Sequence, residues 1–200
     1  MRLLYKSLIG LSFAALAACG PKVEADKAGP WSLVSSQSNI SYVTIKSGSL
    51  AEVNTFGQIS GSVSNSGQAE FIVYLDSVDT SNDIRDPRLR EFLFQTETYP
   101  LAKATSKLDM AQLNALAIGD SKVVTLDLTL EFHGVSEQFD VDMRVTRTGA
   151  NKAKVDTIAP LLIDAEDFGL EGGLAKLQEL AGLESITPVV SATVGLTFER

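Results

Sequence analysis

The sequence predicts an all-β fold, an antiparallel eight-stranded β-barrel with one or two short helices. From Trp31 onward, apolar and polar residues alternate with a period of two, which is typical of strands with one buried face. About eight such segments follow one another, and segments with helical spacing are few. A sheet of this size must pack against a second sheet or close on itself.

Eight segments carry the alternation and are the predicted strands. Each has one apolar and one polar face, because successive side chains of a strand point to opposite sides. A closed barrel of eight strands has room for packed side chains or for one elongated ligand, and the residues alone leave both alternatives open. The predicted strands span residues 39–46, 54–63, 70–75, 102–108, 123–132, 139–145, 152–158 and 189–198.

The clearest pattern is a predicted antiparallel hairpin of residues 123–132 and 139–145, connected by a short turn at residues 133–136. One face of this hairpin is apolar and the other is charged, so the apolar face must point into the barrel. If the barrel is hollow, that face lines the cavity. The residues predicted to line it are Leu126, Leu128, Leu130, Phe132, Phe139, Val141 and Met143.

Three segments have helical spacing. Residues 84–94 are predicted to form a helix with Asp86 as its N-cap and Pro87 at its first helical position. Residues 171–183 carry leucines on one stripe and predict an amphipathic helix, which either covers an open end of the barrel or packs outside it. Residues 110–117 are a weaker candidate for a third helix.

Composition and charge exclude several classes of function. The 200 residues include 17 basic and 25 acidic ones, giving a net charge of −8, which disfavours a nucleic-acid partner. A single cysteine excludes an internal disulfide and a cysteine-cluster metal site, and a single histidine excludes His-rich zinc or copper sites. That histidine, His133, lies in the predicted hairpin turn without a nucleophile motif, so we interpret it as a turn residue. No catalytic residue is assigned, and the protein is not expected to be an enzyme.

The N-terminus has the features of a secretory signal. Arg2 and Lys6 precede an apolar stretch of eleven residues, which is too short to span a bilayer as a helix. The stretch ends in Leu-Ala-Ala-Cys, which resembles the lipobox of bacterial lipoproteins and implies cleavage before Cys19 and acylation of that residue, palmitate included. The alternative is an ordinary signal peptide whose cysteine is incidental.

These features divide the chain into three parts. Residues 1–18 are the predicted signal peptide, residues 19–30 a lipidated flexible tether, and residues 31–200 the barrel domain. Three acyl chains on Cys19 would exceed the two signals that stable membrane anchoring requires. Gly20, rather than Asp, follows the cysteine. By resemblance to Gram-negative lipoproteins, this favours the outer membrane, with the barrel facing the periplasm.

Five segments together resemble the YceI-like, or polyisoprenoid-binding, family of bacterial periplasmic proteins. They occur in the family's order and cover nearly all of residues 31–200. The most specific segment contains Ser77, Thr80, Arg85-Asp86 and Leu89, followed by Phe92, Phe94 and Tyr99-Pro100; Arg88 stands where the family usually has His. The other segments are Trp31 with residues 38–42, residues 56–63, residues 128–135 and residues 167–170.

The resemblance implies a lipocalin-like barrel whose elongated apolar pore holds a polyisoprenoid chain, such as the tail of a quinone or prenyl lipid. Phe92 joins the predicted lining residues, and Arg85 and Asp86 are candidates for a polar rim that holds the ligand's head. A structural alternative is that Asp86 caps the helix while Arg85 pairs with a carboxylate. The pore alternative is favoured over a packed core once the resemblance is added.

The expected function is therefore binding, storage or transfer of an isoprenoid or similar amphiphile by an envelope lipoprotein, with no cofactor. Two other functions remain open at this point. One is a structural or stress-response lipoprotein with a filled barrel, and the other is an enzyme that acts on a lipid head group. The sequence leaves the ligand's identity and the oligomeric state open, a dimer included.

Overall fold

The computed structural model describes residues 29–200, so the signal peptide, Cys19 and most of the tether lie outside the described residues. Twelve antiparallel strands form one sheet in this part of the chain. Their bounds are β1 Trp31–Leu33, β2 Asn39–Lys46, β3 Leu50–Phe56, β4 Ile59–Val63, β5 Gln68–Tyr74, β6 Val78–Asp79, β7 Leu101–Lys107, β8 Ser121–Phe132, β9 Val135–Gly149, β10 Lys152–Thr157, β11 Leu161–Asp164 and β12 Val189–Glu199.

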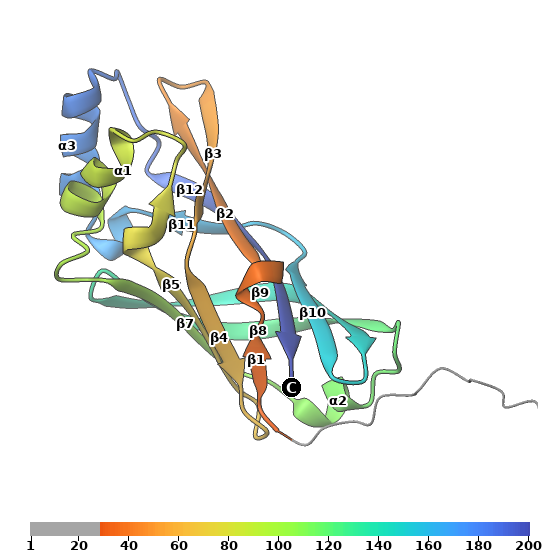
Figure 1. The fold of residues 1–200 in the computed structure, drawn as a ribbon. Coiled ribbons are helices and arrows are strands. Elements are labelled where there is room, and N and C mark those ends of the chain that lie inside the picture. The colour runs from red at the N-terminus through yellow and green to blue at the C-terminus, as the bar shows by residue number, and fades with distance from the viewer. Residues whose placement is uncertain (1–28) are drawn as a thin grey trace, which may run out of the picture.

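The sheet closes into a barrel of eight strands, which confirms the predicted fold class. The order β1-β4-β5-β7-β8-β9-β10-β12 returns to its start because β12 also pairs with β1. Closure joins Ser32 to Glu199 and Leu33 to Phe198, so the beginning and the end of the domain meet at one end of the barrel. Beyond this ring, β2 and β3 extend the wall as a tall hairpin (Figure 1).

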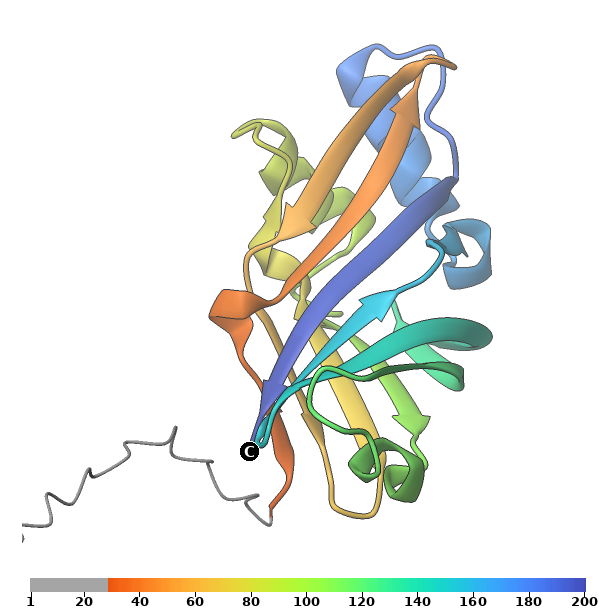
Figure 2. The same ribbon diagram turned by 90° about the vertical axis from the view of Figure 1, so that its right-hand side faces the viewer.

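One of the predicted strands is interrupted in the structure, which the sequence pattern did not predict. Residues 54–63, predicted as one strand, belong to β3 and β4, and β3 starts four residues earlier. The break falls at Gly57 and Gln58, whose backbone N–H groups donate to the carbonyl and hydroxyl oxygens of Ser77. The inward-facing positions change phase across the break, from Asn54 and Phe56 to Ile59 and Val63. The strands around the break run in different directions in Figure 2.

The helices lie where helical spacing predicted them, but the first differs in form. It consists of α1 (Arg85–Arg88) followed by a π-helical turn, η3 (Leu89–Leu93). Asp86 is not its N-cap, because the Oδ1 atom of Asn82 instead accepts from the N–H groups of Ile84 and Arg85. Because α1 begins at Arg85, Pro87 is its third residue, whereas the sequence predicts it as the first. The other helices are α2 (Met110–Asn114) and α3 (Glu171–Ala181), both shorter than predicted.

Two helical segments meet at one end of the barrel, where α3 packs against η3 (Figure 1). The contact is close at Gly173, since a Cβ there would come within 2.4 Å of the Phe92 carbonyl oxygen. Among the helices of residues 29–200, none has the length and apolarity needed to cross a lipid bilayer.

Candidate functional site

The barrel encloses a cavity of about 660 Å³. Its wall is built from every second residue of the surrounding strands, so the period of two in the sequence becomes one continuous apolar lining. Clefts of this volume are typical of small-molecule sites. The lining from β8 and β12 consists of Val124, Leu126, Leu128, Leu130, Phe132, Val190, Ala192, Val194, Leu196 and Phe198.

The cavity is elongated along the strands. The lining runs from Val124 to Phe132 on β8, a stretch that spans about 26 Å at about 3.3 Å per residue. Four aromatic rings that line it, those of Tyr42, Phe56, Phe94 and Phe132, contact one another in succession with centroids 5.4–6.0 Å apart. The apolar part of the cavity therefore matches a long hydrocarbon chain in shape and polarity.

Helices cover one end of this cavity. Leu174, Leu177 and Ala181 of α3 line it, as do Leu89 and Leu93 from the two ends of η3. Of the two arrangements that the sequence allowed for residues 171–183, the structure thus has the helix over the end of the barrel.

Six of the eight predicted lining residues lie on the cavity: Leu126, Leu128, Leu130, Phe132, Val141 and Met143. Two do not. Phe139 shares the hairpin face but packs into a smaller cluster around Leu130 and Phe168, beside the cavity. Phe92 is turned away because η3 directs Leu89 and Leu93, four residues apart, inward. A lining role for Phe92 and Phe139 is therefore wrong in the described structure.

The β2–β3 hairpin makes the covered end of the cavity polar. Its inward face carries cross-strand pairs in register, Tyr42 opposite Asn54 and Thr44 opposite Glu52, with Lys46 at the next position. Polarity thus rises along the hairpin, from neutral to charged side chains. Sequence reasoning missed these residues, although the alternation in residues 39–46 already placed Tyr42, Thr44 and Lys46 on one face.

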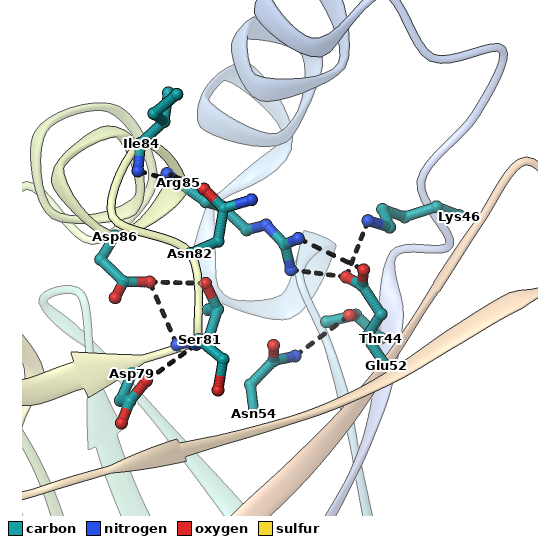
Figure 3. A network of polar contacts seen from close by, with 11 residues as sticks. Thr44, Lys46, Glu52, Asn54, Asp79, Ser81, Asn82, Ile84, Arg85 and Asp86 are labelled. Atoms are coloured by element: carbon teal, nitrogen blue, oxygen red, sulfur yellow. Dashed lines mark hydrogen bonds and ion pairs between the residues drawn. The ribbon is translucent and has the colours of Figure 1, made fainter.

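Three charged side chains form an ion-pair layer at this end, with Glu52 between Lys46 and Arg85 (Figure 3). Arg85 donates from Nη1 and Nη2 to the two carboxylate oxygens of Glu52, at 2.5 and 3.2 Å, and Lys46 Nζ lies 2.7 Å from Glu52 Oε2. Burial opposes ionisation of Glu52, but the hydrogen bonds from Lys46 and Arg85 outweigh it and hold the pKa of the carboxyl below its usual value. Glu52 is therefore ionised at neutral pH.

The two candidate rim residues, Arg85 and Asp86, differ in their position relative to the cavity. Arg85 lines the cavity and also pairs with a carboxylate, so both interpretations of it describe part of its role. Asp86 belongs to neither interpretation, because it is not among the described cavity-lining residues and does not cap α1. Its Oδ1 instead accepts hydrogen bonds from the backbone N–H of Thr80, at 3.1 Å, and from the Thr80 hydroxyl, at 2.5 Å. Asp86 thus anchors the loop before α1.

Two buried polar atoms lie next to the ion-pair layer without a hydrogen-bond partner in residues 29–200. They are the hydroxyl oxygen of Tyr42 and Oδ1 of Asn54, whose Nδ2 donates to the Thr44 hydroxyl at 3.1 Å. Burial, reinforced by the nearby charge of Asp86, raises the pKa of Tyr42, so its hydroxyl keeps its proton. Asn54 is only 3% exposed.

His133 lies in the β8–β9 turn, as the sequence predicted, with a positive φ of 50°. Its Nδ1 is 3.1 Å from the carbonyl oxygen of Phe168, and its ring lies 4.3 Å from that of Tyr99. His133 is separate from the cavity lining. Within the described part of the chain, no group of three or more His, Cys, Asp or Glu side chains is arranged to hold a metal ion.

Comparison with known proteins gives the same architecture. A polyisoprenoid binding domain from Saccharophagus degradans, implicated in plant cell wall breakdown, is 35% identical with a TM-score of 0.84, covering 85% of this chain and 98% of that one. BcnA from Burkholderia cenocepacia is 21% identical with a TM-score of 0.63, covering 82% and 98%. The YceI protein of Campylobacter jejuni is 16% identical with a TM-score of 0.51, covering 74% and 84%.

The last two similarities concern the fold alone. No curated protein matches the chain. The model of the YceI-like domain matches residues 31–199, which is nearly the whole described structure. The chain therefore belongs to the YceI-like domain family.

Proposed function

We propose that this protein binds a polyisoprenoid or a similar amphiphilic lipid, with the tail in the barrel cavity and the head toward the Lys46–Glu52–Arg85 layer. The observation that carries the proposal is the elongated apolar cavity of about 660 Å³ with this charged layer at its covered end. The 35% identical relative, described as a polyisoprenoid binding domain, supports the same ligand class. The role is binding, without a covalent step.

Burial of the tail would supply most of the affinity. A chain that buries on the order of 300 Å² of apolar surface gains about 7 kcal/mol at 25 cal/mol per Å². Ordering a flexible chain offsets part of this gain, so the affinity depends on how well the cavity fits the chain. The polar end contributes orientation, since a head group placed among the leucines would lose its hydrogen bonds.

The proposal extends to the cell envelope through the N-terminus. Acylation of Cys19 would anchor the barrel to the membrane, and residues 19–30 would serve as a flexible connection. An outer-membrane position facing the periplasm would let the barrel store a lipid or transfer it between membranes.

The test is to analyse the lipid bound to the purified protein by native mass spectrometry and organic extraction. We expect one isoprenoid-containing molecule per chain, or saturable binding of an added prenyl lipid. A protein that carries no lipid and binds no added prenyl lipid would contradict the proposal. Conversion of the added lipid to a new product would instead indicate an enzyme.

A further inference from the structure

The charged groups at the polar end of the cavity already have partners. Arg85 uses two nitrogens on Glu52, and Lys46 contacts the same carboxylate. Arg88, which also lines the cavity, donates from Nη1 to the carbonyl oxygen of Leu180 in α3 at 3.2 Å. An anionic head group would have to compete with Glu52 for Arg85 and Lys46, and it would lie beside that ionised carboxylate.

The polar groups without a hydrogen-bond partner that lie next to this layer are uncharged. The Tyr42 hydroxyl and Asn54 Oδ1 lack partners in the described residues, and leaving such buried groups unpaired is costly. Tyr42 and Asn54 are direct cross-strand partners on the inward face, so their Cβ atoms lie about 5 Å apart. One small head group can therefore reach both side chains.

The two atoms require complementary partners. The protonated Tyr42 hydroxyl can donate a hydrogen bond, and Asn54 Oδ1, as an amide oxygen, can only accept one, while the Nδ2 of Asn54 donates to the Thr44 hydroxyl. A group that satisfies both must offer an acceptor and a donor. Alcohols, phenols and primary amides do so, whereas a simple ether offers no donor and a phosphate brings charge.

We propose that Tyr42 and Asn54 select a ligand whose neutral head group both donates and accepts hydrogen bonds. The head group would lie beside the Lys46–Glu52–Arg85 layer. This inference rests on the proposed function and specifies its ligand. It predicts that the protein distinguishes a prenyl alcohol from its phosphate even though the tails are identical.

The experiment compares three probes that share one tail: geranylgeraniol, its methyl ether and geranylgeranyl monophosphate. Affinities for the full purified chain are measured by competition against a fluorescent lipid. We expect the alcohol to bind at least tenfold more tightly than the phosphate, and about three- to tenfold more tightly than the ether, which is the effect of one buried hydrogen bond.

Tyr42→Phe should lower the affinity about three- to tenfold for both the alcohol and the ether, because each accepts a hydrogen bond from the Tyr42 hydroxyl. Asn54→Leu should lower the affinity for the alcohol about three- to tenfold and leave the affinity for the ether within twofold, because the ether has no donor for Asn54 Oδ1. Tyr42→Phe should fold at least as well as the wild type, because it removes an unpaired buried hydroxyl. Tyr99→Phe is the matched control, since Tyr99 contacts His133 outside the cavity lining. It should leave all three affinities unchanged.

The outcomes separate this inference from the proposed function. Equal binding of all three probes, or an unchanged alcohol affinity in both variants, would overturn the selection by Tyr42 and Asn54 while lipid binding stands. Tighter binding of the phosphate would overturn the neutral head group and assign the site to Arg85 and Lys46. Binding of none of the probes would overturn both proposals.

Discussion

Arg85 and Glu52 are joined by two parallel hydrogen bonds across 33 positions of the sequence. Arg85 is the first residue of α1, and Glu52 lies on the inward face of β3. The pair therefore connects the helical cover of the barrel to the β2–β3 hairpin at the polar end of the cavity (Figure 3). Glu52 also contacts Lys46, so one carboxylate pairs with two cations.

The ion-pair layer should make the stability of the folded protein depend on pH. The pKa of Glu52 is lower in the folded protein than its ordinary value of 4.5, so its stabilising contribution is present above that pH and is lost as pH falls below it. We expect the loss of Tm between pH 7 and pH 3.5 to be smaller in Glu52→Gln than in the wild type. Thermal melts at both pH values measure this difference, and equal losses would show that Glu52 does not contribute.

A bulky side chain on the cavity wall should displace the ligand. Leu128→Trp places an indole in the cavity, so the amount of copurified lipid should fall several-fold while Tm changes little. In a filled interior the same change would cost about 1–3 kcal/mol through overpacking. Thr129→Trp, on the opposite face of β8, is the control and should leave lipid binding unchanged. A large drop in Tm for Leu128→Trp, with no lipid in the wild type, would contradict a hollow barrel.

The packing of α3 on η3 should depend on Gly173. Gly173→Ala introduces a Cβ within 2.4 Å of the Phe92 carbonyl oxygen and 2.9 Å of the Leu93 Cα atom, which is backbone and cannot easily move. We expect a loss of about 1–3 kcal/mol in chemical denaturation. Gly172→Ala, where nothing lies within 4 Å, is the neighbouring control and should gain up to about 1 kcal/mol from helix propensity. Similar effects of the two changes would mean that the close contact is not required.

His133 should matter for stability but not for binding. His133→Asn keeps a residue that tolerates the positive φ, but it alters the contact with the Phe168 carbonyl. We expect a loss of about 1 kcal/mol in stability and lipid affinity within a few-fold of the wild type. If lipid affinity fell a hundredfold with the fold intact, His133 would belong to the binding site.

Cys19 should decide membrane anchoring. In Cys19→Ser, the signal before residue 19 should remain uncleaved, and radiolabelled palmitate should not be incorporated, because the acceptor thiol is lost. Labelling and fractionation of cells that produce each form test this expectation. A serine variant that is processed and fractionates with membranes as the wild type does would contradict the lipoprotein assignment.

Alternation in the sequence was sufficient to predict the barrel and much of its lining. Residues 39–46 match β2, and the hairpin of β8 and β9 places Leu126, Leu128 and Met143 on the cavity as predicted. These features follow from local chemistry, because a strand with one apolar face must turn that face away from water. The ordered motifs of residues 31–200 likewise indicate the YceI-like family, and the match of the family model confirms it.

The polar end of the cavity was decided by the tertiary structure. Glu52 and Arg85 are 33 residues apart, and they meet because β3 pairs with β6, the strand that precedes α1. The strand break at Gly57, the π-helical turn that turns Phe92 away and the pairing of Asp86 with Thr80 also arise from how the folded segments contact one another. A period of two shows which face of each strand is apolar, but it carries no information about which segments meet at the barrel's end. The sequence thus determined the apolar wall, and long-range packing determined which polar groups lie at its end.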